Sequence, residues 1–321
     1  MKSNHHKIFA VDEDNIRIDI FLSSKIEGFS RSKIKKLIID GKVLIDNETV
    51  KPSLILNQGQ EIFCDLEIQE KENVLEPQKV DFNIIFEDEH LIVINKPAGL
   101  VVHPGNGNYS NTLANGLLYY LKDISALDPL RPGIVHRLDM DTSGVIVTVK
   151  NEKAHHAVSK LFENRKVEKE YKAIVWGTPE GENIIKNYIQ RDLRNKTAFR
   201  VSETTGREAI TKYKTIENFG PLSLVSLYPK TGRTHQLRVH MKSIGHPIFS
   251  DDKYSGGNKN IKSFHTKYSS ILRRCFKIGR RQMLHASSIE FTHPFTNKKL
   301  KFETDLPSDM LNLIKLLKDE F

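Results

Sequence analysis

Cysteine is scarce in this 321-residue chain, whose two cysteines, Cys64 and Cys275, lie far apart. Without a C-x-x-C pair they argue against a disulfide framework and a cysteine-based zinc site. Long apolar runs are also missing, since none approaches the roughly 18 residues that suggest a membrane-spanning helix, and the first ten residues have no apolar signal segment. We therefore expect reduced cysteines and a cytoplasmic protein without a membrane partner.

Glycine-rich phosphate loops are missing as well. No G-x-G-x-x-G motif opens a helix after a strand, and the T-G-R sequence at 231–233 lacks the further glycines of a phosphate loop. His235, His240 and His246 have no carboxylate or cysteine at metal-ligand spacing. The sequence therefore predicts neither a nucleotide cofactor nor a metal, and no other cofactor.

The chain does have enough apolar residues for a core and a clear excess of positive charge. An apolar content of 38% and this length fit one large domain plus a small one. A net charge of +9 and a pI near 9.3 favour a polyanionic partner. Because basic proteins with other functions exist, the position of the charges matters more than their sum.

Residues 15–65 have the pattern of a small separate domain. A short helix is predicted from Arg17, and a second helix begins after Ser30, a possible N-cap, and ends before Gly41. Two strand-like segments follow, separated in part by a turn at Asp46 and Asn47. This order resembles the S4 RNA-binding domain. We interpret residues 1–14 as a tail and the charged, aperiodic residues 66–80 as a linker.

Cations crowd the start of the second predicted helix: Arg31, Lys33, Lys35 and Lys36. Positive charge at a helix N-terminus opposes the helix dipole, so this cluster suggests a nearby anion such as an RNA phosphate. A solvated basic helix face without a ligand is the alternative.

The most informative segment is H-R-L-D-M-D-T-S-G at residues 136–144, followed by V-I-V-T-V. It has the pattern of a turn that leads into a buried strand. Asp139 lies between an arginine and a hydroxyl-rich turn, and it is the candidate catalytic residue. Aspartate before threonine and serine also occurs in ordinary turns, where side-chain oxygens accept nearby backbone N–H groups, so Asp139 alone carries no assignment.

Further segments accompany this one in order: K-E-Y-K-A at 169–173, T-G-R-T-H-Q-L-R-V-H at 231–240, L-H-A at 284–286 and H-P at 293–294. Together they closely resemble the pattern of the pseudouridine synthases that modify ribosomal RNA. The segment N-K-P-A-G-L-V-V-H-P-G at 95–105 is similar to that of the branch acting on the large ribosomal subunit. The resemblance implies a large-subunit ribosomal RNA, or its precursor, as the partner, with uridines in a hairpin loop of 23S ribosomal RNA as substrate.

Strand signals dominate residues 81–321 and are interrupted by a few helical patterns, at 154–163 and at the C-terminal end. There Ser308 is a possible cap for a helix with Met310, Leu313 and Leu317 on one face. The pattern predicts an α+β catalytic domain with a mixed, largely antiparallel sheet and flanking helices. The resemblance implies the pseudouridine synthase fold.

The implied reaction cuts an N–C glycosidic bond and rejoins the base through carbon, which requires no cofactor. Asp139 is then either a nucleophile at the anomeric carbon or a base on the sugar. Arg238 matches the basic partner that keeps this carboxylate ionised, and its neighbours alternate as in a strand. Tyr171 matches an aromatic residue that stacks on the target base. An inward aromatic on a strand is its ordinary explanation.

Several cations are predicted to bind RNA. Arg137 matches a residue that fills the space left by the flipped nucleotide, although a phosphate contact has the same sequence signal. Residues 253–282 contain nine Lys or Arg and no Asp or Glu, and we expect them to follow the RNA backbone. The predicted RNA-binding residues outside the small domain are Arg137, Arg233, His235, Arg273, Arg274, Arg280 and Arg281.

Two other functions fit parts of the sequence. A non-catalytic ribosome-assembly factor needs only the S4-like domain and the basic body, but the joint presence of Asp139, Tyr171 and Arg238 argues against it. A glycoside hydrolase needs a second carboxylate, and none stands in the signature.

Overall fold

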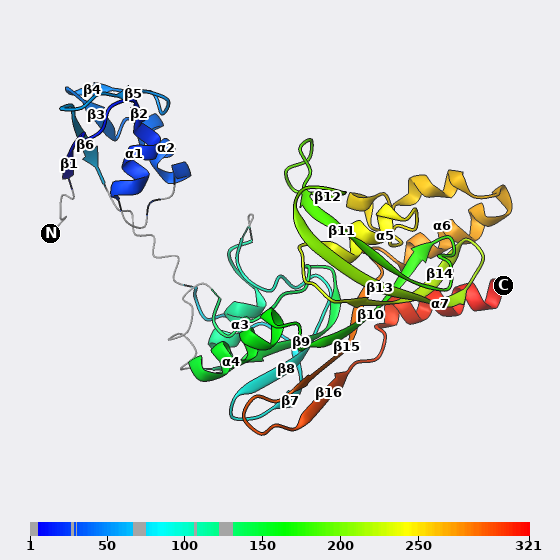
Figure 1. Cartoon of the computed structure of the whole chain (residues 1–321). Coiled ribbons are helices and arrows are strands. Elements are labelled where there is room, and N and C mark those ends of the chain that lie inside the picture. The colour runs from blue at the N-terminus through cyan, green and yellow to red at the C-terminus, as the bar shows by residue number, and fades with distance from the viewer. Residues whose placement is uncertain (1–5, 27–28, 30, 67–74, 106–107, 122–130) are drawn as a thin grey trace. The chain divides into compact units, whose positions relative to one another are not determined.

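The computed structural model describes residues 6–26, 29, 31–66, 75–105, 108–121 and 131–321, except for the side chains of Ser32 and Lys33. The chain divides into two compact units, residues 1–73 and residues 74–321 (Figure 1). Within the described ranges, no helix is both long and apolar enough to cross a bilayer.

The first unit is a small α/β domain. Its elements are β1 (His6–Ala10), β2 (Ile16–Arg17), α1 (Ile18–Lys25), α2 (Arg31–Ile39), β3 (Val43–Ile45), β4 (Glu48–Thr49), β5 (Ile55–Leu56) and β6 (Glu61–Asp65). The strand order is β1-β6-β3-β4, and β2 pairs with β5. The sequence predicts a tail for residues 1–14, but residues 6–10 form a strand of this unit. They pair antiparallel with β6, and Phe9 packs against the core of the unit.

The ends of α2 and the following hairpin illustrate how this unit is specified. Gly41 has a φ of +70° and its N–H donates to Ile38, while Lys42 donates to Leu37, so the helix ends in a Schellman motif. Asp46 and Asn47 both have positive φ, at +52° and +65°, and form the tight turn between β3 and β4. Ser30 lies outside the described residues, so its capping role stays a prediction.

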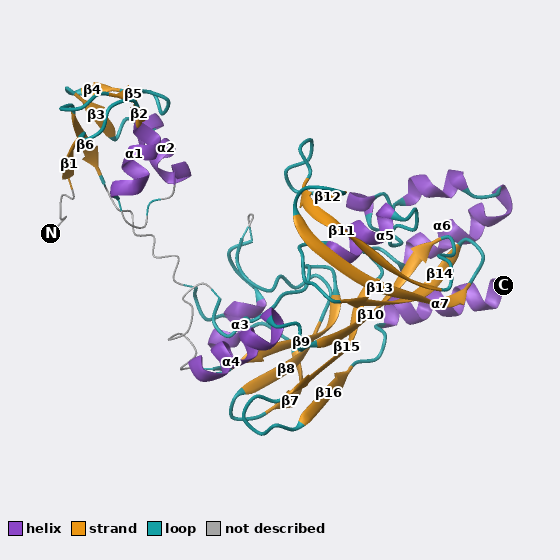
Figure 2. Cartoon of the chain, in the orientation of Figure 1, coloured by secondary structure: helices purple, strands orange, loops and turns teal. Residues whose placement is uncertain are grey.

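The second unit contains one ten-stranded sheet with helices on both faces (Figure 2). Its elements are β7 (Asn83–Glu87), β8 (Leu91–Lys96), α3 (Leu113–Tyr120), β9 (Ser143–Val149), α4 (Glu152–Glu163), β10 (Glu168–Trp176), β11 (Glu182–Arg191), β12 (Phe199–Ser202), β13 (Arg207–Asn218), β14 (Leu222–Pro229), α5 (Gln236–Ser243), η2 (Asp252–Tyr254), η3 (Asn258–Ser263), η4 (Thr266–Tyr268), α6 (Ser269–Ile278), β15 (Leu284–Thr292), β16 (Lys299–Glu303) and α7 (Ser308–Glu320).

The strand order of this sheet is β12-β11-β13-β14-β10-β15-β9-β8-β7, and β16 pairs antiparallel with residues 288–292 of β15 outside this order. The pairing of β9 with β15 is parallel, and the other pairings along the order are antiparallel. The predicted α+β fold with a mixed, largely antiparallel sheet is confirmed.

Alternating residues of the central strand β10 bury against different helices. Ile174 and Trp176 share a core with α6 and α7, whereas Ala173 and Val175 pack with Leu237 of α5 on the other face. Because α5 is a helix, the strand expected around Arg238 is wrong. A strand-like alternation of three residues is too short to be distinguished from one buried face of a helix.

Candidate active site

Asp139 lies in the loop before β9, and close backbone packing fixes that loop. Ser143 and Gly144 pair with His285 and Ala286 of β15. A Cβ atom on Gly144 would lie 2.1 Å from the Ala286 carbonyl oxygen, and its φ is +112°. Only glycine therefore allows this approach of the two strands, which explains the glycine that ends the signature.

The segment at 95–105 holds the same loop through hydrogen bonds. The fully buried ammonium of Lys96 donates to the carbonyl oxygens of Pro97, Leu100 and Met140, at 2.7, 2.9 and 2.9 Å. Gly99 also donates its N–H to the Met140 carbonyl, at 3.0 Å. Burial lowers the pKa of Lys96 to about 7. Two sequence motifs that lie 40 residues apart thus form one structural unit.

Arg238 joins two carboxylates at the centre of the site. Its Nη1 donates to Asp139 Oδ2 at 2.9 Å, while Nε and Nη2 donate to the two oxygens of Asp251 at 2.6 and 2.8 Å. Burial disfavours the charge of Arg238, but Asp251 and then Asp139 outweigh it and raise its pKa. In the described parts of the chain, the other oxygen of Asp139 has no hydrogen-bond or ion-pair partner.

The T-G-R-T-H-Q-L-R motif orients Arg238 through the buried side chain of Gln236. Its Oε1 accepts from the Thr231 hydroxyl and from the Arg233 N–H, at 2.7 and 3.0 Å. Its Nε2 donates to Ile210 and Thr211 of β13. The loop after β14 is therefore held against the sheet, and α5 begins directly after it with Arg238 in its first turn.

Asp251 is a site residue that the sequence analysis missed. It lies in a tight loop in which Gly256 accepts from the Ser250 N–H and donates to the Asp251 carbonyl. The Trp176 indole N–H also donates to Gly256, at 2.8 Å. The carboxylate is 1% exposed. The sequence around it, S-D-D-K-Y-S-G-G at 250–257, indicates a turn. Nothing in its spacing from Arg238 shows that the two side chains meet.

Tyr254 covers the other side of the guanidinium. The Arg238 carbon Cζ lies 4.9 Å from the centre of the Tyr254 ring, a cation–π contact. The Tyr254 oxygen accepts from the Phe199 N–H at 3.0 Å and lies 2.6 Å from His235 Nδ1. Burial lowers the pKa of His235 to about 4, so this ring is neutral at pH 7 and shares one hydrogen bond with the tyrosine hydroxyl. His235 thus holds Tyr254 in place, and the RNA contact that the sequence predicts for it stays a prediction.

Asp139, Tyr171 and Arg238 line one pocket of about 580 Å³. Tyr171 comes from β10 and packs partly against apolar clusters on both sides of it. Burial, and then the charge of Asp139, raises the pKa of Tyr171, so its phenol is protonated at neutral pH. The exposed Arg137 and the half-buried Arg233 lie in the same lining. The structure thus brings six predicted site residues together: Arg137, Asp139, Tyr171, Arg233, His235 and Arg238.

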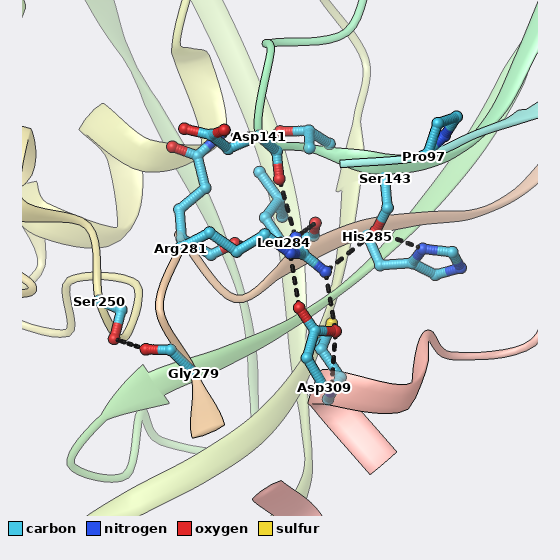
Figure 3. A network of polar contacts seen from close by, with 12 residues as sticks. Pro97, Asp141, Ser143, Ser250, Gly279, Arg281, Leu284, His285 and Asp309 are labelled. Atoms are coloured by element: carbon cyan, nitrogen blue, oxygen red, sulfur yellow. Dashed lines mark hydrogen bonds and ion pairs between the residues drawn. The ribbon is translucent and has the colours of Figure 1, made fainter. Parts of the chain in front are cut away.

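Arg281 does not belong to a free basic surface, although the sequence predicts RNA binding for it. Its guanidinium pairs with Asp309 of α7, at 2.7 and 3.1 Å, and donates to the carbonyls of Asp141 and Leu284 (Figure 3). It also donates to the Ser143 hydroxyl at 3.2 Å. These bonds occupy its donors inside the protein. Arg281 therefore ties the loop of Asp139 to the C-terminal helix. The N-cap of that helix is Pro307, with no side-chain cap bond, so the cap expected at Ser308 is wrong.

The other predicted RNA-binding residues of the second unit are not part of the pocket lining. Arg273, Arg274 and Arg280 are exposed, and Arg274 pairs with Glu320 at 3.4 Å. In the first unit, the buried Asp19 of α1 binds Arg31 at 2.9 Å and lies 3.6 Å from Lys35. This acid partly neutralises the predicted cluster, because α1 packs beside α2 in a way that the local sequence does not show.

Lys36 is exposed, and the side chain of Lys33 lies outside the described residues. Throughout the described ranges, no group of three or more His, Cys, Asp or Glu is placed to hold a metal ion.

Comparisons with known proteins place these features in a family. Residues 90–243 match a family model described as RNA pseudouridylate synthase, and residues 16–62 match the S4 domain. An uncharacterized RNA pseudouridine synthase of Chlorobaculum parvum is 40% identical, over 92% of each chain. Ribosomal large subunit pseudouridine synthase D of Zymomonas mobilis is 37% identical, over 94% of this chain and 93% of its own.

Solved structures agree at the level of the fold. Human RNA pseudouridylate synthase domain containing 4 superposes with a TM-score of 0.57 at 24% identity, covering 74% of this chain and 93% of its own. This similarity extends the match from sequence to the arrangement of the sheet.

Proposed function

Because the chain belongs to the RNA pseudouridine synthase family and is an isomerase of RNA uridines, we propose that it acts on 23S ribosomal RNA with Asp139 as the reacting carboxylate. Relatives named ribosomal large subunit pseudouridine synthase D, at 34–37% identity, support this substrate. Family membership also sets aside the assembly-factor and glycoside hydrolase alternatives.

The single observation that carries the role of Asp139 is its half-satisfied carboxylate. Arg238 holds one oxygen at 2.9 Å, and the side chain is 19% exposed at the pocket. The guanidinium fixes the orientation of the carboxylate, while the other oxygen is available to attack the anomeric carbon or to remove a sugar proton. In both routes the bond between the anomeric carbon and N1 breaks, and its electron pair leaves with the base.

Tyr171 is suited to hold the detached base. A pocket of about 580 Å³ accommodates a nucleotide, within the usual range for small-ligand sites. The protonated phenol ring forms part of its wall, and base–aromatic stacking contributes about 1–3 kcal/mol per base. Tyr171 would keep the base in the pocket while it turns. When C5 then bonds to the anomeric carbon, either the bond from Asp139 to that carbon breaks or Asp139 returns the proton to the sugar, and C5 finally loses its own proton.

The pocket requires an unpaired nucleotide, and exposed cations elsewhere fit the RNA around it. Turning the nucleotide out of the stack costs a few kcal/mol. The exposed Arg137 of the pocket lining is suited to fill the space that this nucleotide leaves. Exposed Arg273, Arg274 and Arg280, with Arg31 and Lys36 in the S4 domain, supply sequence-independent phosphate contacts.

Mapping of pseudouridines tests this proposal. Ribosomal RNA is taken from cells that lack the gene, complemented with wild type or with Asp139→Asn, and is probed by carbodiimide labelling and primer extension. We expect 23S positions that are modified only with the wild-type gene. If all strains give identical 23S patterns, the proposed substrate is wrong. If Asp139→Asn restores the modification, the proposed role of Asp139 is wrong.

A further inference from the structure

One wall of the pocket is strongly cationic, beyond the residues that the reaction uses. Its members are Arg165, Lys169, Arg207, Lys230 and Arg233, called here the cationic wall. Arg165 follows α4, Lys169 lies on β10, Arg207 begins β13, and Lys230 and Arg233 lie in the loop after β14. Among the described residues, two acids share the lining, Asp139 and Glu163.

Lys169 is the unusual member, because it is half-buried without a counter-ion. It lies two residues before Tyr171 on β10, so both side chains face the pocket. The adjacent Glu170 points to the opposite face, where it pairs with Lys172 at 2.7 Å. Within the described parts of the chain, Lys169 and Lys230 form no ion pair. Burial, and then the charge of Lys230, lowers the pKa of Lys169 to about 8.

The arginines of the wall are crowded as well. Burial lowers the pKa of Arg233, and the nearby charges of Arg207 and Arg165 lower it further. Glu208 pairs with Arg165 at 3.5 Å, but it is shared with Lys186 at 3.6 Å. Like charges held together without enough counter-charge raise the energy of the free protein. A bound anion would remove this cost.

We propose that the cationic wall is a subsite for the RNA phosphate diesters next to the target uridine, with Lys169 as its buried contact. The inference rests on the proposed RNA substrate. A flipped nucleotide brings its backbone to the mouth of the pocket, whereas its base enters beside Tyr171. The wall therefore binds the backbone of any sequence, and base recognition is left to other residues.

Binding of a single-stranded oligouridylate to the full-length protein tests the subsite without requiring turnover. The slope of log affinity against log salt should fall by about 0.7 for each lost phosphate contact, in Lys169→Met and equally in the exposed Lys230→Met. Lys169→Arg should keep the wild-type slope. Lys166→Met is the matched control, because Lys166 is exposed and lies outside the pocket lining.

A second oligouridylate with neutral methylphosphonate linkages identifies the contacted group. The difference between wild type and Lys169→Met should disappear with this probe. Equal salt slopes for all variants, or an unchanged loss of affinity with the neutral backbone, would overturn the subsite. Failure to form pseudouridine in 23S ribosomal RNA would refute the proposed substrate separately.

Discussion

Arg238 and Arg281 are both largely buried arginines in sequence motifs, yet they have different surroundings. Arg238 holds the buried Asp251 with two bonds and Asp139 with one, and Asp139 faces the pocket. Arg281 donates to Asp309 and to the backbone carbonyls of Asp141 and Leu284. The two arginines thus differ in where their partners lie: Asp139 lines the pocket, where it is available for chemistry, whereas Asp309 lies outside that lining and joins Arg281 to the C-terminal helix.

Of the variants that test this comparison, Arg238→Met should have the largest effect. Arg238→Met removes the charge that faces Asp251, and an uncompensated buried charge costs about 3–5 kcal/mol of unfolding free energy. Turnover should fall at least about 1,000-fold, because an electrostatic donor at the reacting group is lost. Chemical denaturation and single-turnover assays measure both. The double variant Arg238→Met/Asp251→Asn should regain stability but not activity, and equal instability of the two would contradict the ion-pair account.

Asp251→Asn should have a smaller effect on the same centre. The side chain keeps its shape, but the guanidinium loses charged hydrogen bonds, each contributing about 1.5–3 kcal/mol. We expect kcat to fall about tenfold while KM for RNA stays unchanged, because Asp251 positions Arg238 and does not line the pocket. A rise in KM with unchanged kcat would instead indicate a role in RNA binding.

Arg281→Met and Arg280→Met form a matched pair that tests the structural role of Arg281. Loss of the internal bonds of Arg281 should lower unfolding free energy by about 2 kcal/mol, with the salt slope of RNA binding unchanged. Arg280 is exposed, so its replacement should leave stability within about 0.5 kcal/mol and reduce the slope. The reverse pattern would mean that Arg281, and not Arg280, contacts RNA.

The smallest effect concerns His285. The Ser143 hydroxyl, which accepts from Arg281, lies 2.9 Å from Nδ1 of this histidine. Burial lowers its pKa from 6.5 to about 4. The unfolded chain therefore takes up a proton between these values, and stability is lost as pH falls from 6.5 towards 4. This residue should contribute about 1–2 kcal/mol of loss by pH 5. His285→Asn should show a shallower pH dependence in denaturation curves, and an identical slope would contradict the assignment.

The sequence predicts the elements well where local chemistry decides them. The buried strand after the signature and the end of α2 at Gly41 follow from apolar runs and from glycine geometry. Asp139, Tyr171 and Arg238 were identifiable because each lies in a recognisable motif, and the structure brings them to one pocket.

The errors have a common cause in contacts between distant segments. Arg281 has the sequence signal of a surface cation, and only the position of α7 gives it Asp309 as a partner. Asp19 neutralises part of the S4 cluster in the same way. Lys169 was missed because burial beside a pocket has no local pattern. Charge in a sequence therefore predicts a partner, but not whether that partner is RNA or the protein itself.

Asp139→Asn in the purified protein, with transcribed 23S ribosomal RNA as substrate, tests the central claim most directly. The account predicts that pseudouridine formation falls by at least about 10,000-fold, as for loss of a reacting group, while RNA affinity and unfolding free energy stay within about 1 kcal/mol of wild type. Substantial turnover by a well-folded Asp139→Asn protein would contradict the assignment of this carboxylate to the chemistry.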